Sequence, residues 1–266
     1  MAHKWYFLLA CIGLVIIAAL PPLTEVSYDS RSTQDVVFSV LMISIQPYQA
    51  WGWIFHVGTL LLLLYILWRP GRAGRALAGY MGINYLIVAA IQSHAVTEKY
   101  GFSLLTGAMV GTALLGITWL VVTIQNSLTL SFHNISKWKL LLLPLALLVF
   151  WSPVKVDAGS ISPNFDPRLL LTSADYGLTY CFVTPVFLFL LILFSTNPSS
   201  FIFRITAFNG LLYGLFNMAH WFNPNTVWMG VMHLPLLILS LVALILPYLG
   251  QPGHKKSGIL PAITPH

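Results

Sequence analysis

Residues 50–68 read AWGWIFHVGTLLLLLYILW, and this run contains no Asp, Glu, Lys or Arg side chain. About 20 mostly apolar residues are enough for a helix to cross the hydrocarbon core of a bilayer. The rest of the chain is similar in character, since 58% of its residues are hydrophobic and only 8% are charged, and its mean hydropathy is +0.82. A soluble domain carries about 25% charged residues. The composition therefore predicts a membrane protein whose surface is covered by lipid.

Seven further apolar runs complete a set of eight predicted spans, so we expect an all-α integral membrane protein with eight transmembrane helices. An additional segment, Val36–Gln46, is apolar but too short to span, and we expect it to lie in the membrane interface or to dip in as a re-entrant segment. Residues 249–266 are predicted to form a disordered cytoplasmic tail. The predicted spans are Trp5–Leu20, Ala50–Trp68, Ala76–Val96, Phe102–Ile124, Trp138–Trp151, Tyr176–Phe194, Ile205–Trp221 and Thr226–Tyr248.

Recurring motifs predict that the second half of the chain is a copy of the first. Residues 1–124 and 137–248 would then be two parallel four-helix repeats, and a ligand site would be expected where they meet. The motifs recur in the same order: Trp51-Gly52-x-x-Phe55-His56 as Tyr176-Gly177-x-x-Tyr180-Cys181, Gly82-x-x-Tyr85 as Gly210-x-x-Tyr213, and Gly107-x-Met109 as Gly230-x-Met232.

The charged residues predict an orientation in the cell membrane. If the N-terminus is cytoplasmic and the spans alternate, nine basic residues fall inside and four outside, and all seven acidic residues fall outside. This is the distribution that the positive-inside rule favours, and it places both termini in the cytoplasm. The basic residues are scattered singly along loops, so the net charge of +6 does not indicate a nucleic-acid partner. The lipid bilayer is the expected partner.

Imidazole and sulfur groups from several predicted spans fall at one depth, in the outer third of the membrane. Imidazole binds Zn, Cu, Fe and Ni, and sulfur ligands select softer ions such as Cu(I), while two histidines can also hold a haem iron. The sequence therefore predicts an outward-facing site for a transition metal, a haem or a small polar solute, with haem or copper as the possible cofactor. The predicted ligands are His56, His94, His220, His233, Cys181, Met109 and Met232, and the predicted repeat partners His94 and His220 are expected to face each other.

Other polar side chains in the spans are expected to line the same pocket further inward. An alternative interpretation is that these groups make hydrogen bonds between helices, which contribute about 0.6 kcal/mol each. Glu98 follows His94 by four residues and is expected on the same helix face, where it could orient the imidazole ring, and Asp175 is expected at the outer mouth. The predicted pocket-lining residues are Asn84, Gln92, Asn209, Asn217, Thr59 and Thr184.

Two further functional classes stay open beside a ligand-binding membrane protein. One is a non-catalytic subunit or scaffold that docks a membrane protein partner through its glycine-rich helix faces, Gly107-x-x-x-Gly111 and Gly210-x-x-x-Gly214. The other is an uncoupled solute channel or permease. Carriers coupled to protons or sodium usually bury a carboxylate in a span, and no acidic residue falls in the middle of a predicted span. No motif of a known reaction decides whether the protein is an enzyme.

Overall fold

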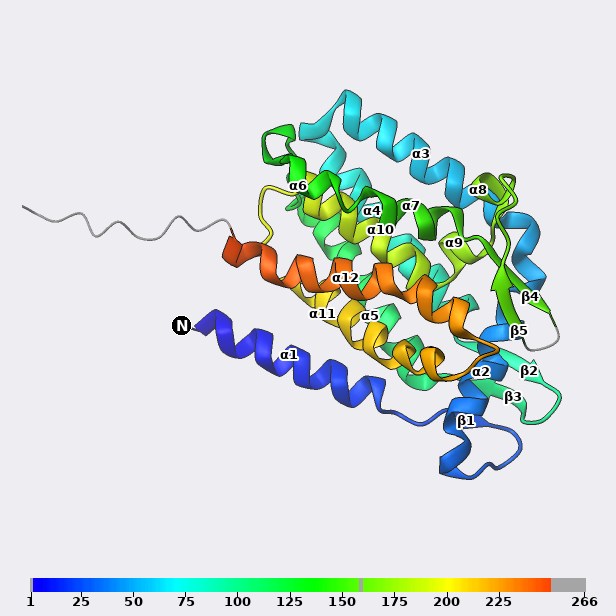
Figure 1. Ribbon diagram of the computed structural model, residues 1–266. Coiled ribbons are helices and arrows are strands. Elements are labelled where there is room, and N and C mark those ends of the chain that lie inside the picture. The colour runs from blue at the N-terminus through cyan, green and yellow to red at the C-terminus, as the bar shows by residue number, and fades with distance from the viewer. Residues whose placement is uncertain (1, 158–159, 250–266) are drawn as a thin grey trace, which may run out of the picture.

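Helices account for most of the computed structural model, which describes residues 2–157 and 160–249, and they run side by side in one bundle (Figure 1). A helix occupies most of each predicted span, although the range Trp138–Trp151 is divided between two short helices. The predicted tail lies almost entirely outside the described residues. The bundle consists of α1 (Ala2–Ala18), α3 (Gly52–Trp68), α4 (Pro70–Ile91), α5 (Thr106–Gln125), α6 (Lys137–Leu140), α7 (Leu143–Trp151), α10 (Tyr180–Phe194), α11 (Phe201–Phe216) and α12 (Val227–Leu249).

Four helical segments of the described chain are long and apolar enough to cross a membrane. A fifth candidate is a bent pair, Leu169–Leu178 with Tyr180–Phe194, whose two arms meet at 100°. The helix Trp5–Ala18 is apolar but shorter. These lengths and compositions support a multi-pass membrane protein of the all-α class. The four segments are Ser30–Trp68, Pro70–Ile91, Thr106–Gln125 and Val227–Tyr248.

Glycine residues allow the helices of the bundle to approach closely. α4 and α5 meet at Gly82 and Gly116, where a Cβ added to either glycine would lie 3.0 Å from the other's carbonyl oxygen. A Cβ at Gly107 would overlap the carbonyl oxygen of Ile17 in α1. At Gly214 a Cβ would lie 3.1 Å from the backbone of Leu237 in α12. The glycine-rich faces predicted for a partner protein are therefore in contact with α1 and α12 of the same chain.

One end of the bundle carries two small sheets and several short helices (Figure 1). The hairpin of β2 and β3 has the register His94↔Leu104 to Thr97↔Gly101, and β1 pairs antiparallel with β3. All seven acidic residues belong to segments at this end, between residues 25 and 175. The elements here are β1 (Leu23–Thr24), η1 (Ser30–Ser32), α2 (Thr33–Ser44), η2 (Gln46–Trp51), β2 (His94–Thr97), β3 (Gly101–Leu104), β4 (Val154–Asp157), β5 (Ser160–Pro163), α8 (Leu169–Thr172), α9 (Asp175–Leu178) and η4 (Asn217–Phe222).

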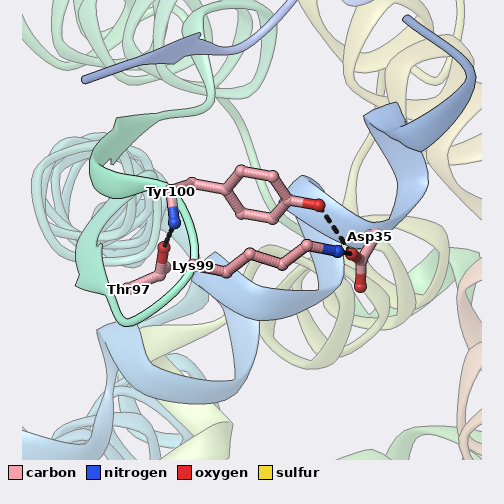
Figure 2. A network of polar contacts seen from close by, with 4 residues as sticks. All are labelled: Asp35, Thr97, Lys99 and Tyr100. Carbon is pink, nitrogen blue, oxygen red and sulfur yellow. Dashed lines mark hydrogen bonds and ion pairs between the residues drawn. The ribbon is translucent and has the colours of Figure 1, made fainter. Parts of the chain in front are cut away.

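The short helix α2, which covers most of the predicted interfacial segment, is held against the β2–β3 hairpin. Its Val36 and Val40 side chains are fully buried. Figure 2 shows that Asp35 of α2 receives two bonds from the hairpin turn, one from Lys99 Nζ at 2.6 Å and one from Tyr100 Oη at 2.6 Å. The Asp35 carboxylate raises the pKa of Lys99 above its usual value because it accepts this hydrogen bond. Since both side chains are exposed, the ion pair orients α2 more than it stabilises the fold.

Replacing Gly107 with Ala should destabilise the protein, because the new methyl group would push α1 away from α5. Overpacking of this kind costs about 1–3 kcal/mol. Gly13→Ala is the matched control, since a Cβ at Gly13 meets nothing within 4 Å and Ala favours a helix over Gly. Thermal unfolding in detergent should show a lower midpoint for Gly107→Ala and an equal or higher one for Gly13→Ala. Equal midpoints for the two variants would contradict the packing described.

Candidate functional site

The helix that begins the sixth predicted span is broken. The backbone leaves helical geometry at Tyr176 (ψ 126°) and Gly177 (φ 93°) before α10 starts at Tyr180. A positive φ is readily adopted only by glycine. A Cβ at Gly177 would also overlap the ring of Phe55. The sequence therefore places a glycine where both the backbone and the neighbouring helix α3 require one.

Polar side chains from neighbouring helices bind the broken segment. Asn84 Nδ2 donates to the Gly177 carbonyl at 2.9 Å, and Gln92 Oε1 accepts from the Tyr180 backbone N–H at 2.8 Å. Irregular backbone at membrane depth is tolerated only where it is buried in protein or lines a cavity, because the hydrocarbon offers no hydrogen bonds. Asn84 and Gln92 were predicted to line a pocket, and in the structure they supply those bonds.

Tyrosine side chains around the break were not predicted from the sequence. Tyr176 Oη lies 2.7 Å from Thr59 Oγ1, and Tyr180 Oη accepts from Asn209 Nδ2 at 2.8 Å. Tyr80 Oη lies 3.0 Å from the same Thr59 hydroxyl and donates to the Phe55 carbonyl at 2.9 Å. The sequence did contain a signal for them, because tyrosines inside apolar helices need partners for their hydroxyl groups. Thr59 and Asn209, both predicted as pocket-lining, are among those partners.

Three polar atoms near the break are buried and have no hydrogen-bond partner among the described residues. They are Asn84 Oδ1, Tyr85 Oη and Thr184 Oγ1. The Tyr85 ring lies 5.8 Å from the Tyr180 ring and 5.6 Å from the Phe187 ring, measured between centroids. The interior here is tightly packed with aromatic rings. Thr184, which was predicted to line a pocket, is therefore enclosed by packing.

His56 also belongs to the broken segment. Its ring is fully buried and packs against the rings of Phe150 and Tyr176, at centroid distances of 4.7 and 4.9 Å. Its Nε2 lies 2.9 Å from the Ser173 carbonyl oxygen. A carbonyl can only accept, so Nε2 carries the proton of a neutral ring. The Nδ1 lone pair has no partner among the described residues.

Asp175 is the first residue of α9, the short helix that contains the break. Its Oδ2 atom accepts from the hydroxyl groups of Ser152 and Ser173, at 3.2 and 3.4 Å. Asp175 was predicted at the outer mouth beside the ligand residues. In the structure it joins α9 to the end of α7 and to the segment before α9.

Apart from the broken segment, a second group of predicted site residues is a pair of imidazole rings at the end of the bundle that carries the sheets. The rings of His220 in η4 and His233 in α12 are stacked, with centroids 5.7 Å apart and planes 21° apart. His233 is buried and His220 is half-buried. His233 Nδ1 lies 2.7 Å from the Met229 carbonyl oxygen. Because the carbonyl can only accept, Nδ1 carries the proton and Nε2 holds the lone pair.

Sulfur-containing side chains lie in and around this cluster to different extents. Asn217 Nδ2 donates to Cys181 Sγ at 3.8 Å and to the Tyr213 carbonyl at 2.8 Å, and it precedes His220 by one turn. Met232 is fully buried next to His233 in α12. Met109 is half-buried in the first turn of another helix, α5. Asn217 therefore joins Cys181 to η4, the element that carries His220, whereas Met109 belongs to a different helix.

The sequence-based placement of His94 and Glu98 was wrong. α4 ends at Ile91, so His94 lies in strand β2 and Glu98 in the turn that follows, and no helix face joins them. His94 is exposed, and its ring lies 6.0 Å from that of Phe102. The expected face-to-face pair of His94 and His220 does not form. His220 is stacked on His233 instead.

Within residues 2–157 and 160–249, no group of three His, Cys, Asp or Glu side chains is close enough to hold a metal ion. The predicted set therefore divides into residues that bind the broken helix, a pair of histidines, and residues that stand apart. Comparisons of the chain with protein-family models, with curated proteins and with solved structures find no match.

Replacing Asn84 with Ala should destabilise the protein, because the Gly177 carbonyl would lose its donor in a region that water does not reach. Leaving a buried acceptor unpaired costs about 1–3 kcal/mol. Gln49→Ala, at an exposed position, is the control and should leave the thermal midpoint in detergent unchanged. If Asn84→Ala unfolds at the same temperature as Gln49→Ala, the broken segment does not depend on this bond.

Proposed function

We propose that the protein is a multi-pass membrane protein that binds a copper(I) ion through the imidazole pair His220–His233. The observation that carries this proposal is the proximity of two imidazole rings from different elements, whose centroids lie 5.7 Å apart. The two imidazoles belong to η4 and to the first two turns of α12, and this end of α12 lies at the end of the bundle that carries the two small sheets (Figure 1). An ion could therefore reach them from the aqueous phase on that side.

The tautomer of His233 supports a ligand role. Its Nδ1–H donates to the Met229 carbonyl, which fixes the ring and leaves Nε2 as a lone-pair donor. Histidines that ligate metals usually donate their other ring N–H in this way. A neutral imidazole is a suitable ligand for copper.

The number of ligands distinguishes copper(I) from zinc. Structural zinc takes four protein ligands and catalytic zinc takes three, whereas copper(I) is stable with two nitrogen or sulfur donors. Among the described residues no group of three His, Cys, Asp or Glu side chains offers a zinc-type site. Asn217, three residues before His220 in η4, donates to the Cys181 thiol, which is a soft group.

Haem is a poorer fit to the same residues. A macrocycle needs a slot between or beside its axial ligands, and the two histidine rings are stacked on each other. A cavity of about 450 Å³ is lined by residues that include Leu23 and Phe102, and another of about 150 Å³ by residues that include Trp119 and Asn197. Neither cavity is lined by His220 or His233. The proposal therefore names copper.

We also infer eight crossings, with both termini in the cytoplasm, in two parallel repeats. The segregation of all seven acidic residues to segments at one end supports the crossing number and the orientation. The repeat is supported by its equivalent glycines, which both lie where the halves touch. A Cβ at Gly52 would lie 2.7 Å from the backbone of Ser173 and Ala174, while Gly177 meets Phe55.

A second candidate function is that of a membrane subunit without chemistry of its own. It is favoured by the polar side chains Asn84, Gln92 and Asn209, which bind the protein's own backbone and tyrosines. A channel or permease would need such groups to face a pathway. The solute channel is therefore the weakest of the three candidates.

Copper binding tests the main proposal. Protein purified in detergent under reducing conditions should compete with a copper(I)-selective chelator and retain one ion per chain. His220→Ala and His233→Ala, singly and together, should abolish this retention while the protein still unfolds at a normal temperature. His94→Ala is the matched control, since His94 is exposed on β2, and it should bind as wild type does. Unchanged binding in the double variant, or none in wild type, would refute the proposal.

Cysteine labelling tests the crossing number and the orientation. In a background without Cys11 and Cys181, a cysteine at Ser30 should react with an impermeant reagent from outside intact cells. A cysteine at Gly71, in the first turn of α4, should react only after the membrane is opened. Both positions are exposed in the structure. Labelling of both from the same side would reject the proposed topology.

A further inference from the structure

Arg204 lies at the end of the bundle opposite the sheets, where three helices meet. It belongs to the first turn of α11, and its guanidinium carbon is 3.8 Å from the centroid of the Phe7 ring of α1. Its Nη2 donates to Tyr248 Oη, in the last turn of α12, at 3.5 Å. α1, α11 and α12 therefore hold one cation between them.

The protein itself compensates this charge poorly. Nε of Arg204 is buried and has no hydrogen-bond partner among the described residues, and the bond to Tyr248 is at the upper limit of length. Stacking on Phe7 is favourable by about 0.5–2 kcal/mol but does not satisfy the N–H donors of the group. A partly buried cation whose donors are incompletely bonded needs an anion or other acceptor from elsewhere.

No acidic side chain of the chain is placed to serve as that anion. All seven Asp and Glu residues lie between Glu25 and Asp175, on segments at the far end of the bundle (Figure 1). The surroundings of Arg204 are apolar and open to lipid, since Phe201 is 48% exposed and Tyr248 is 66% exposed. Arginine near the end of a membrane helix sits at the level of the lipid headgroups. Basic pockets between membrane helices bind such headgroups.

We propose that Arg204, with Phe7 and Tyr248, forms a binding site for the phosphate group of a membrane lipid headgroup. Because Nε is covered, the phosphate approaches the Nη1 and Nη2 end of the guanidinium, where two N–H groups can donate to it side by side. The Tyr248 hydroxyl, now bonded only at 3.5 Å, can turn to donate to the same phosphate. Phe7 holds the guanidinium plane in place.

Native mass spectrometry of detergent-purified protein tests the site with phosphatidic acid, diacylglycerol of the same acyl chains, and soluble glycerol 3-phosphate. Wild type should retain phosphatidic acid and not diacylglycerol, and Arg204→Gln should weaken retention about tenfold or more, as expected for loss of a charged hydrogen bond. Arg75→Gln is the matched control, since it removes the same charge at an exposed position of α4 at this end, and it should bind as wild type does.

Each other result has a defined meaning. Equal retention by Arg204→Gln and wild type, or equal loss in Arg75→Gln, would overturn the site, and equal binding of diacylglycerol would show that only acyl chains are recognised. Competition by glycerol 3-phosphate as strong as that by phosphatidic acid would overturn the lipid as the source and assign a soluble phosphate. If Arg204→Gln fails to fold, Arg204→Lys and Tyr248→Phe replace it. Both should unfold normally and retain several-fold less lipid, and undiminished retention in both would overturn the proposal.

Discussion

The structure depends on one constraint, which is that every polar backbone group inside an apolar bundle needs a hydrogen-bond partner from the protein. The break between α9 and α10 shows how the constraint is met. Tyr176, Gly177 and Thr179 leave helical geometry, so the Gly177 carbonyl and the Tyr180 N–H lose the partners that a helix would give them. Asn84 and Gln92, both from the region of α4, take their place. The polar residues of the interior are explained first by this need.

The molecule also has two ends with different chemistry. Sheets, short helices and all acidic residues gather at one end, where the histidine pair also lies (Figure 1). At the other end the turns are short and the charged residues are basic, so a partly buried arginine has no carboxylate nearby. The two proposed ligands follow from this division. Two imidazoles close together suit a soft cation, and an incompletely bonded guanidinium suits a phosphate.

Hydropathy predicted the helical ranges because an apolar run of sufficient length has few other solutions in a membrane. It could not predict where a helix stops inside such a run. Ala95 and Val96 are as apolar as the residues of α4, yet they pair as strand β2, and His94 therefore moved out of the predicted site. The break at Gly177 was also hidden, because the run from Tyr176 to Phe194 is continuous in hydropathy. The positive φ at position 177 and the contact with Phe55, which belongs to a helix distant in sequence, together require a glycine there.

Side-chain partners were harder to predict than helices. They depend both on the rotation of each helix about its axis and on the depth of each residue along that axis. Repeat symmetry suggested His94 with His220, whereas the fold of η4 brings His220 back onto His233 of the next helix. Asn84 and Asn209 are buried and Gln92 is half-buried, but a sequence does not reveal whether such an amide faces a ligand or a neighbouring backbone. The alternative of hydrogen bonding between helices, open at the level of sequence, describes what these three side chains do.

The most direct test of this account is residue-resolved hydrogen–deuterium exchange of the protein in lipid nanodiscs. The backbone amides of Tyr180, Phe182 and Val183 are bonded to Gln92 or to the Thr179 carbonyl. They should exchange as slowly as the interior of α4, although they follow a break in the helix. Exchange as fast as that of the exposed segment around Ser30 would show that the break is open to water. Such fast exchange would contradict the claim that polar side chains shield the break from water.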